Sequence, residues 1–268
     1  MDQLTLQKLL SNLPLGAVRY FHTIESTNDL AIRWAEAGAP HLALVVADEQ
    51  TAGRGRAGRR WFTPAGSALA FTMVLRQGVG ELATYLPRLT ALGALAVCDT
   101  LNAALPPVTP AQIKWPNDVV VNRRKLAGVL AEAHWRGEQL TALILGIGIN
   151  VAQASVPPPE MVDFPSTCVE EVLEQAVDRW ELLRVVLKKL LEWHQRLEEP
   201  EFIRAWERRL AFRGEWIQLI VENQPPLEGL LLGLEADGSL RLRLRSGETA
   251  AFQFGEVRLR PQKPTQAV

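Results

Sequence analysis

The chain has few of the residues that build disulfide frameworks and zinc sites. It is 268 residues long and contains 2 cysteines and 4 histidines. Cys98 and Cys168 are too few for a disulfide framework, so we expect a reducing compartment, the cytoplasm. The histidines are scattered without the spacing of metal ligands, which argues against a histidine-based zinc site.

Long apolar runs and an excess of charge of one sign are also absent. No apolar run approaches the roughly 18 residues of a membrane-spanning helix, and the first residues do not resemble a secretory signal. The formal net charge is -1 and the pI is about 6.5, whereas domains that bind nucleic acid are usually strongly basic. We therefore expect a globular protein with no membrane and no DNA partner.

One nine-residue segment nevertheless concentrates positive charge. Residues 53–61 read Gly-Arg-Gly-Arg-Ala-Gly-Arg-Arg-Trp and hold four arginines and three glycines. The planar fork of arginine matches a carboxylate or a phosphate, and glycine lets the backbone come close to a ligand. The segment, called the cationic loop below, predicts a local anionic ligand.

The glycines of the loop also spell a dinucleotide-binding pattern, G-x-G-x-x-G, at Gly53, Gly55 and Gly58. That fingerprint requires the third glycine to open a helix whose N-terminus holds the pyrophosphate. Here the loop leads to a second strand-like run, Ala68–Leu75, and no Gly-Lys-Ser/Thr follows. Both the dinucleotide fingerprint and the Walker A loop are therefore disfavoured.

Hydrophobic periodicity predicts an α/β (α+β) protein with a mixed α/β domain over residues 1–212 and a small β-barrel over 213–268. The Asp237-Gly238 pair between alternating runs is a strong hairpin signal. Helices are expected in the first dozen residues and over about 26–38, 81–105 and 166–210; strands are expected over 17–22, 42–47, 68–75, 119–121, 126–133 and 140–149 and around Ile113.

Two short motifs place charged and amide groups close together in the sequence. Residues 114–118 read Lys-Trp-Pro-Asn-Asp, in which Lys114 suits a phosphate and Asp118 suits Mg²⁺, directly or through water. A strand end that turns through a Pro-Asn-Asp loop explains the same residues without a ligand. The second motif, residues 123–128, is basic, and a solvated hairpin tip is its alternative explanation.

Three further features fit either a ligand or ordinary structure. Residues 26–28, Ser-Thr-Asn, stand where a helix cap stands, but a cap explains only one of the three. Gly146 and Gly148 within a strand indicate close approach of a ligand or another backbone. Gln50 is either a polar ligand contact or a loop amide, and Asn150 reads a base edge, supports a metal or ends its strand.

The order of these motifs along the chain resembles that of the biotin protein ligases. The resemblance covers about residues 15–260, and residues 255–260 match the last motif of the family's SH3-like C-terminal domain. It implies a mixed β-sheet flanked by helices, like that of class II synthetases. It also implies two half-reactions: ATP activates biotin to biotinyl-5′-AMP, with Mg²⁺, and a lysine of a biotin carboxyl carrier protein, that of acetyl-CoA carboxylase, then takes the biotin.

The resemblance also assigns residue roles. The catalytic residues are Lys125, Arg54 and Lys114, and the metal ligand is Asp118. The biotin site comprises Ser26, Thr27, Asn28, Gln50, Arg54, Gly55, Arg56, Lys125 and Gly128. The ATP site comprises Arg56, Arg59, Trp61, Lys114, Asn117 and Asn150, with the indole of Trp61 over the adenine.

The sequence departs from the family pattern at two points. The Ser-Thr-Asn motif arrives too early for a preceding winged helix-turn-helix, so we expect no transcriptional repression. Ala57 stands where some relatives carry another arginine, which affects one loop contact. Pairing into a homodimer through the sheet is a further expectation from the family.

Three alternative functions are open at this stage. Lipoate or octanoate attachment uses the same fold, but its apolar substrate has little use for a Ser-Thr-Asn and Gln set. An Arg-Gly loop also occurs in nucleic-acid-binding modules, and the near-neutral charge argues against that function. A protein that binds biotin without ligating it is the third alternative.

Overall fold

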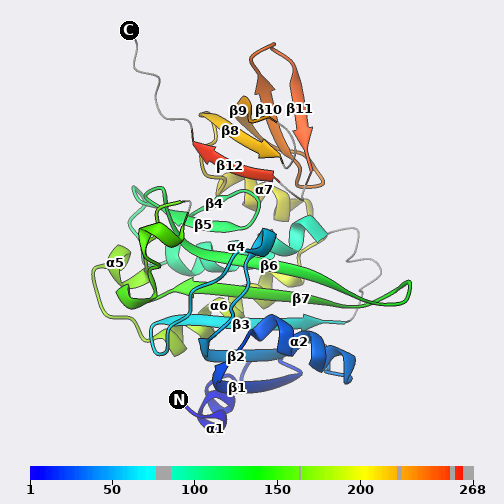
Figure 1. Ribbon diagram of the computed structural model, residues 1–268, viewed down its shortest axis with the longest axis vertical. Helices are drawn as coiled ribbons and strands as arrows, with labels where there is room; N and C mark the ends of the chain where they lie inside the picture. The colour runs from blue at the N-terminus through cyan, green and yellow to red at the C-terminus, as the bar shows by residue number, and fades with distance from the viewer. Residues whose placement is uncertain (77–85, 163, 222–224, 254–256, 262–268) are drawn as a thin grey trace.

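A seven-stranded mixed sheet forms the larger part of the protein (Figure 1). The structure is a computed structural model that describes residues 1–76, 86–162, 164–221, 225–253 and 257–261. The strand order is β1-β2-β3-β7-β6-β5-β4, with β1 and β2 parallel and the other neighbours antiparallel. The strands are β1 (Ala17–Ile24), β2 (Ala43–Gln50), β3 (Ala68–Leu75), β4 (Gln112–Lys114), β5 (Asp118–Val121), β6 (Arg124–Arg136) and β7 (Gln139–Asn150).

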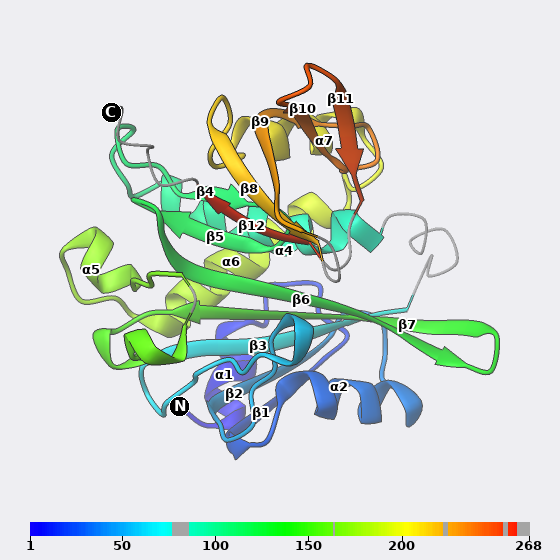
Figure 2. The ribbon, with the colours of Figure 1, turned by 45° about the horizontal axis from the view of Figure 1, so that its top comes forward.

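Helices cover both faces of this sheet (Figure 2). Alternate residues of a strand point to opposite faces, so Leu44 and Val46 enter the main core with α4 and α6, whereas Ala43 and Val45 pack beneath α2. The helices are α1 (Gln3–Leu9), α2 (Thr27–Glu36), α4 (Leu86–Asn102), α5 (Val169–Leu173), α6 (Arg179–His194) and α7 (Pro200–Arg208), with 3-10 turns η1 (Arg56–Gly58), η3 (Gln153–Ser155) and η4 (Pro159–Met161).

The C-terminal part folds as an antiparallel sheet at the β4–β5 end of the large sheet (Figure 1). Its strand order is β11-β10-β9-β8-β12. The contacts that join it to the large sheet include the pairing of Ile113 with Leu210, just before the second sheet begins, and a hydrogen bond of 3.0 Å from the indole Nε1 of Trp115 to the carbonyl of Gly238. The strands are β8 (Trp216–Val221), β9 (Leu227–Leu234), β10 (Leu240–Leu244), β11 (Thr249–Phe252) and β12 (Val257–Pro261).

The predicted fold class is confirmed, with differences in element boundaries. The helical stretch predicted over 166–210 is divided into α5, α6 and α7; Glu174 ends α5 in the left-handed region with φ of 54°, and Pro200 opens α7. The helix predicted over 81–105 is observed from Leu86, and its first residues lie outside the described residues, as do Gly255 and Glu256 of the last motif. The division into domains after residue 212 stays a prediction.

Cys98 and Cys168 are both buried and form no disulfide. None of the helices in the described part of the chain is long and apolar enough to cross a bilayer.

Candidate functional site

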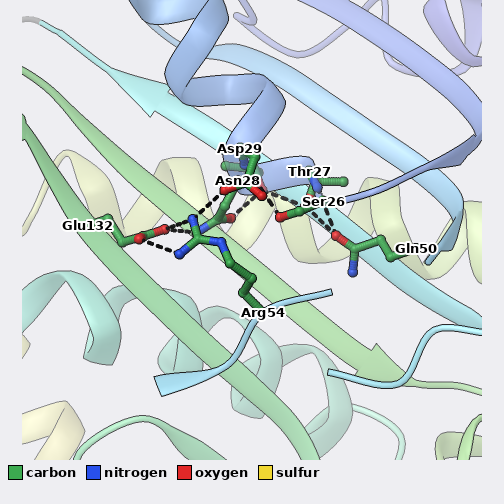
Figure 3. A network of polar contacts seen from close by, with 8 residues as sticks. Ser26, Thr27, Asn28, Asp29, Gln50, Arg54 and Glu132 are labelled. Carbon is green, nitrogen blue, oxygen red and sulfur yellow. Dashed lines mark hydrogen bonds and ion pairs between the residues drawn. The ribbon is translucent and has the colours of Figure 1, made fainter. Parts of the chain in front are cut away.

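A pocket lies on the α2 face of the large sheet, beyond the first turn of α2 and beneath the cationic loop. Its volume is about 470 Å³, including the part that is open to solvent. Figure 3 shows the polar side chains that meet there from α2, the end of β2, the loop and β6. The lining residues are Ser26, Thr27, Asn28, Gln50, Arg54, Gly55, Arg56, Trp61, Ala70, Asn117, Lys125, Gly128, Val129, Leu130, Gly146, Ile147 and Gly148.

The start of α2 supplies hydroxyl and amide groups to one end of the pocket. Ser26 is the N-cap, with its Oγ accepting from the backbone N–H of Asp29 at 3.4 Å, so the helix-cap interpretation is confirmed. Ser26, Thr27 and Asn28 are nevertheless all buried and all line the pocket. A cap and a ligand site therefore use the same turn.

Gln50 is tied to this turn by hydrogen bonds that fix its amide. Its Oε1 accepts from the backbone N–H of Thr27 at 2.8 Å and from the Thr27 hydroxyl at 3.0 Å. Its Nε2 lies 3.1 Å from the hydroxyl of Thr63. Since an amide held from both sides cannot rotate freely, the pocket presents a set pattern of donors and acceptors.

The pocket floor is made of residues with little or no side chain. Gly128 pairs with Gly148 across β6 and β7, and Gly148 pairs with Ala70 of β3. A Cβ on Gly148 would lie 2.2 Å from Cε2 of Trp61. The close approach that glycine was expected to permit is therefore made by the Trp61 side chain rather than by another backbone.

A second floor glycine, Gly146, makes room for Asn28 in the same way. A Cβ there would lie 2.0 Å from Oδ1 of Asn28. Glycine in the strand thus lets a side chain from the helix turn lie flat on the sheet.

A β-bulge turns Lys125 toward this floor. Val119 of β5 pairs with Ala127, but Val120 pairs with Lys125, so Leu126 is an extra residue in β6. The extra residue shifts the alternation of side chains and brings Lys125 onto the face of Gly128.

The ammonium of Lys125 is held by a buried carboxylate. Asp118 Oδ1 lies 2.6 Å from Lys125 Nζ, and Asp118 Oδ2 lies 3.3 Å from Lys114 Nζ. Burial alone would raise the pKa of Asp118, but the two ammonium groups outweigh it and hold the pKa at about 2. Burial lowers the pKa of Lys114, with Asp118 opposing the shift. The carboxylate is therefore ionised and fixes both lysines.

The cationic loop folds over the pocket as a narrow turn. The N–H of Gly55 donates to the carbonyl of Arg59 at 2.7 Å, and the backbones of Arg54 and Arg60 form an isolated antiparallel β-bridge. Ala57 and Gly58 take positive φ values of 53° and 71° at the tip. This turn places Arg56 against the pocket.

Two side chains of the cationic loop reach the pocket from the side opposite the sheet. Arg56 Nη1 donates to Asn117 Oδ1 at 3.3 Å, and burial lowers the pKa of Arg56. The Trp61 ring lies on Gly148 with Lys125 Nζ 5.5 Å from its centroid. Its indole Nε1 is buried and donates to no atom within the described residues.

Arg54 is bound to two acidic residues that the sequence analysis did not identify (Figure 3). Its Nη1 and Nη2 donate to Glu132 Oε1 and Oε2, each at 2.8 Å, and Nη2 lies 2.8 Å from Asp29 Oδ1. The sequence signal for Glu132 was an acidic residue within the otherwise apolar strand predicted over 126–133. Asp29 had no signal of its own, because an acidic residue in a first helical turn is ordinary.

Most of the predicted site residues come together, and four do not line the pocket. Arg59 is exposed at the loop tip. Lys114 and Asp118 lie behind Lys125 and act on the pocket through it. Asn150 is buried at the end of β7, where its Nδ2 donates to the carbonyl of Thr167 at 3.0 Å.

Comparisons with known proteins identify the family of this chain. The model of the Biotin/lipoate A/B protein ligase family matches residues 20–150. A biotin--[acetyl-CoA-carboxylase] ligase of Paracoccus denitrificans is 37% identical over 229 residues, which span 83% of this chain and 92% of that protein. This chain belongs to the biotin/lipoate A/B protein ligase family.

Two further members of the biotin/lipoate A/B protein ligase family extend the likeness. A biotin--[acetyl-CoA-carboxylase] ligase of Mycobacterium tuberculosis is 31% identical, over 87% of this chain and 85% of that one. The biotin protein ligase of Aquifex aeolicus, solved in complex with biotin and ATP, superposes with a TM-score of 0.77 at 30% identity, covering 92% of this chain and 99% of that one. The family match contains every lining residue of the pocket, whereas the second sheet lies beyond it.

Proposed function

We propose that this protein is a biotin–protein ligase that converts biotin and ATP to biotinyl-5′-AMP and then biotinylates a lysine of a carrier protein. The observation that carries the proposal is one pocket that has fixed hydroxyl and amide groups at one end, Lys125 at the other, and Gly128, Gly146 and Gly148 in its floor. The relatives from Paracoccus denitrificans and Mycobacterium tuberculosis carry the name of this activity. The Aquifex aeolicus structure holds biotin and ATP.

The hydroxyl and amide end suits the ureido ring of biotin. A urea is neutral and offers one carbonyl acceptor between two N–H donors, so its partners must be neutral groups in a set geometry. Ser26, Thr27 and Gln50 supply such groups, and their own hydrogen bonds hold them in place. Asn28 lies beside them on Gly146.

The cationic end suits the first half-reaction. Attack of the biotin carboxylate on the α-phosphate of ATP joins two anions, so positive charge that is fixed in advance lowers the barrier. Lys125 and Arg56 both line the pocket. Lys125 contacts the biotin carboxylate and the α-phosphate, and Arg56 contacts the phosphate. The Trp61 ring stacks on the adenine.

The residues around Asp118 do not form a magnesium site. Asp118 faces a lysine ammonium at each of its oxygens, and the described residues contain no group of three or more acidic, histidine or cysteine side chains that suits a metal. A carboxylate committed to two cations is a poor ligand for a third. We propose that Asp118 positions Lys125 and Lys114 rather than holding Mg²⁺.

The acceptor we propose is the biotin carboxyl carrier protein of acetyl-CoA carboxylase, as the names of the relatives imply. Homodimer formation through the sheet also stays a proposal. The edge strand that we propose for it is β1, where Gln3 Nε2 donates to the Val18 carbonyl and Gln3 Oε1 accepts from the Tyr20 N–H. Pairing through this edge requires Gln3 to move.

Exchange of labelled pyrophosphate into ATP tests the proposal against lipoate or octanoate activation. We expect biotin to drive the exchange and lipoate and octanoate to leave it at background, because an apolar acyl chain leaves the amide and hydroxyl groups of the pocket without partners. Exchange driven by lipoate or octanoate supports the rival activity. Biotin binding without any exchange supports a protein that holds biotin and does not activate it.

A further inference from the structure

We propose that Glu132, assisted by Asp29, is a positioning residue that holds Arg54 and thereby fixes the first arm of the cationic loop at the pocket rim. On this view Arg54 anchors the loop, and Arg56 and Lys125 are the cations that meet the substrate. This inference rests on the proposed function, but it concerns residues that no comparison assigns.

The contact geometry is that of an anchor. Glu132 and Arg54 form a two-point pair with both bonds at 2.8 Å, and Asp29 adds an ion pair at 2.8 Å. A two-point arginine–carboxylate pair fixes direction as well as distance. These contacts engage both terminal nitrogens of Arg54, so its charge is compensated before any ligand arrives.

The three groups of this cluster are only partly exposed. The side chains of Arg54, Glu132 and Asp29 are 36%, 25% and 34% exposed. The hydrogen bond to Glu132, more than any other influence, raises the pKa of Arg54. A free cationic site for a substrate carboxylate would not carry two carboxylates of its own.

The other loop contacts contrast with this one. Arg56 donates to the amide oxygen of Asn117, and Arg60 donates to the backbone carbonyl of Thr51. Neither of these acceptors carries a charge. Arg54, by contrast, is held by the carboxylates of Glu132 and Asp29.

Glu132 also ties the loop to the floor of the pocket. Its Oε2 accepts from Nδ2 of Asn28 at 2.7 Å (Figure 3). Oδ1 of Asn28 in turn accepts from the hydroxyl of Thr72 at 2.7 Å. One carboxylate therefore joins β6, the first turn of α2 and the loop. Loss of its charge therefore weakens both the contact with Arg54 and the hydrogen bond that orients the Asn28 side chain.

The anchor divides the loop into a fixed arm and a tip that can turn. Gly55 follows Arg54 directly, and the positive φ values at Ala57 and Gly58 lie beyond it. Because Arg54 stays in place, the pocket opens and closes through a rotation of residues 55–60. The reactive adenylate is then shielded from water by the tip, and this shielding depends on Glu132.

A double-mutant cycle tests the anchor, with Glu132→Gln, Arg54→Gln and the double variant compared with the parent. Glu132→Gln keeps the shape of the side chain and removes its charge. The matched control is Glu181→Gln, because Glu181 also pairs with an arginine, Arg184, but on the exposed side of α6. The first measurement is the rate at which preformed biotinyl-5′-AMP leaves each protein without a carrier.

We expect each single variant to release the adenylate at least roughly tenfold faster than the parent, and the double variant to be no faster than the faster single, because both remove the same contact. The control should match the parent. Release rates that multiply in the double variant, or a Glu132→Gln protein that retains the adenylate as the parent does, overturn the proposal.

The second measurement needs no substrate. Trypsin cleavage after Arg56, Arg59 and Arg60 in the ligand-free protein should be faster in Glu132→Gln than in the parent, with circular dichroism unchanged. Asp29→Asn removes one contact with Arg54, whereas Glu132→Gln weakens two, so the cleavage rate should increase less in Asp29→Asn. Equal cleavage in all variants overturns the anchor even if the parent forms no adenylate, which is the separate failure of the proposed function.

Discussion

At the scale of single residues, one extra residue in a strand decides where the principal cation lies. Without the bulge at Leu126, strict alternation would turn Lys125 to the opposite face of β6 from Gly128. Asp118 then fixes the ammonium at 2.6 Å. The pocket therefore has a positive charge that is oriented before the substrates bind.

The first prediction concerns Lys125 itself. Lys125→Met should lower the rate of biotin-dependent pyrophosphate exchange by roughly 10²–10³, the range for losing one preorganised group that stabilises transition-state charge. The matched control is Arg124→Met, because Arg124 is the neighbouring residue and pairs with Glu171 at the surface. Equal losses in the two variants contradict the assignment of Lys125.

The second prediction concerns the acid stability that Asp118 contributes. Its folded pKa of about 2 lies below the ordinary value of 3.8, so the contribution is full above that value and is lost as the pH falls toward 2. The shift of roughly two units corresponds to about 2–3 kcal/mol. In Asp118→Asn, the free energy of unfolding measured with urea should fall less steeply between about pH 5 and about pH 3 than in the parent. A slope equal to that of the parent contradicts the account of the ion triad.

Residue identities in the site were partly predictable from the sequence. Ser26, Arg56 and Lys125 were found because their motifs combine residue types whose chemistry is specific. Glu132 and Asp29 were missed because their meaning depends on Arg54, which lies 78 residues from Glu132 along the chain. Such a pairing is visible only once the strand register and the loop path are known.

At the scale of elements, the cationic loop is the part whose behaviour with substrates is most open to measurement. Its tip is exposed and rich in arginine, and its glycines allow backbone rotation. The third prediction is that trypsin cuts the ligand-free protein within residues 54–60 and that biotin with ATP protects these bonds. Biotin or ATP alone should protect less, since the adenylate fills both ends of the pocket. Equal cutting in all states contradicts closure.

Element boundaries followed the sequence where local signals were strong. The strand over Ala68–Leu75 was predicted with the bounds that it has. The division of residues 166–210 into three helices was missed, because the left-handed residue that ends α5 is a glutamate rather than a glycine. The bulge in β6 left no sequence signal, because it arises from the pairing of strands.

At the scale of the whole molecule, the second sheet contacts the segment of the large sheet that lies behind the pocket. The hairpin between β9 and β10 reaches Trp115, the residue next to Lys114, and Gly238 at its turn has φ of 91°. A Cβ on Gly238 would lie 2.6 Å from the ring of Trp206. The C-terminal part thus supports the segment that carries Lys114 and Asp118.

The fourth prediction tests this support. Trp115→Phe removes the donor to the Gly238 carbonyl and should lower the free energy of unfolding by about 1–3 kcal/mol, the cost of a buried group left without its partner. Trp216→Phe, at a side chain 38% exposed on β8, should change it by less than about 0.5 kcal/mol. Urea unfolding measures both, and equal effects contradict a supporting role for the hairpin contact.

The most direct test of the central claim is the mass of the acceptor. Purified biotin carboxyl carrier protein is incubated with this protein, biotin and Mg-ATP, and its intact mass is measured, with an independent ligase showing that the carrier is competent. The account predicts a gain of one biotinyl group on a carrier lysine, and no gain when biotin or ATP is omitted. A carrier whose mass stays unchanged here but rises with the independent ligase contradicts the account.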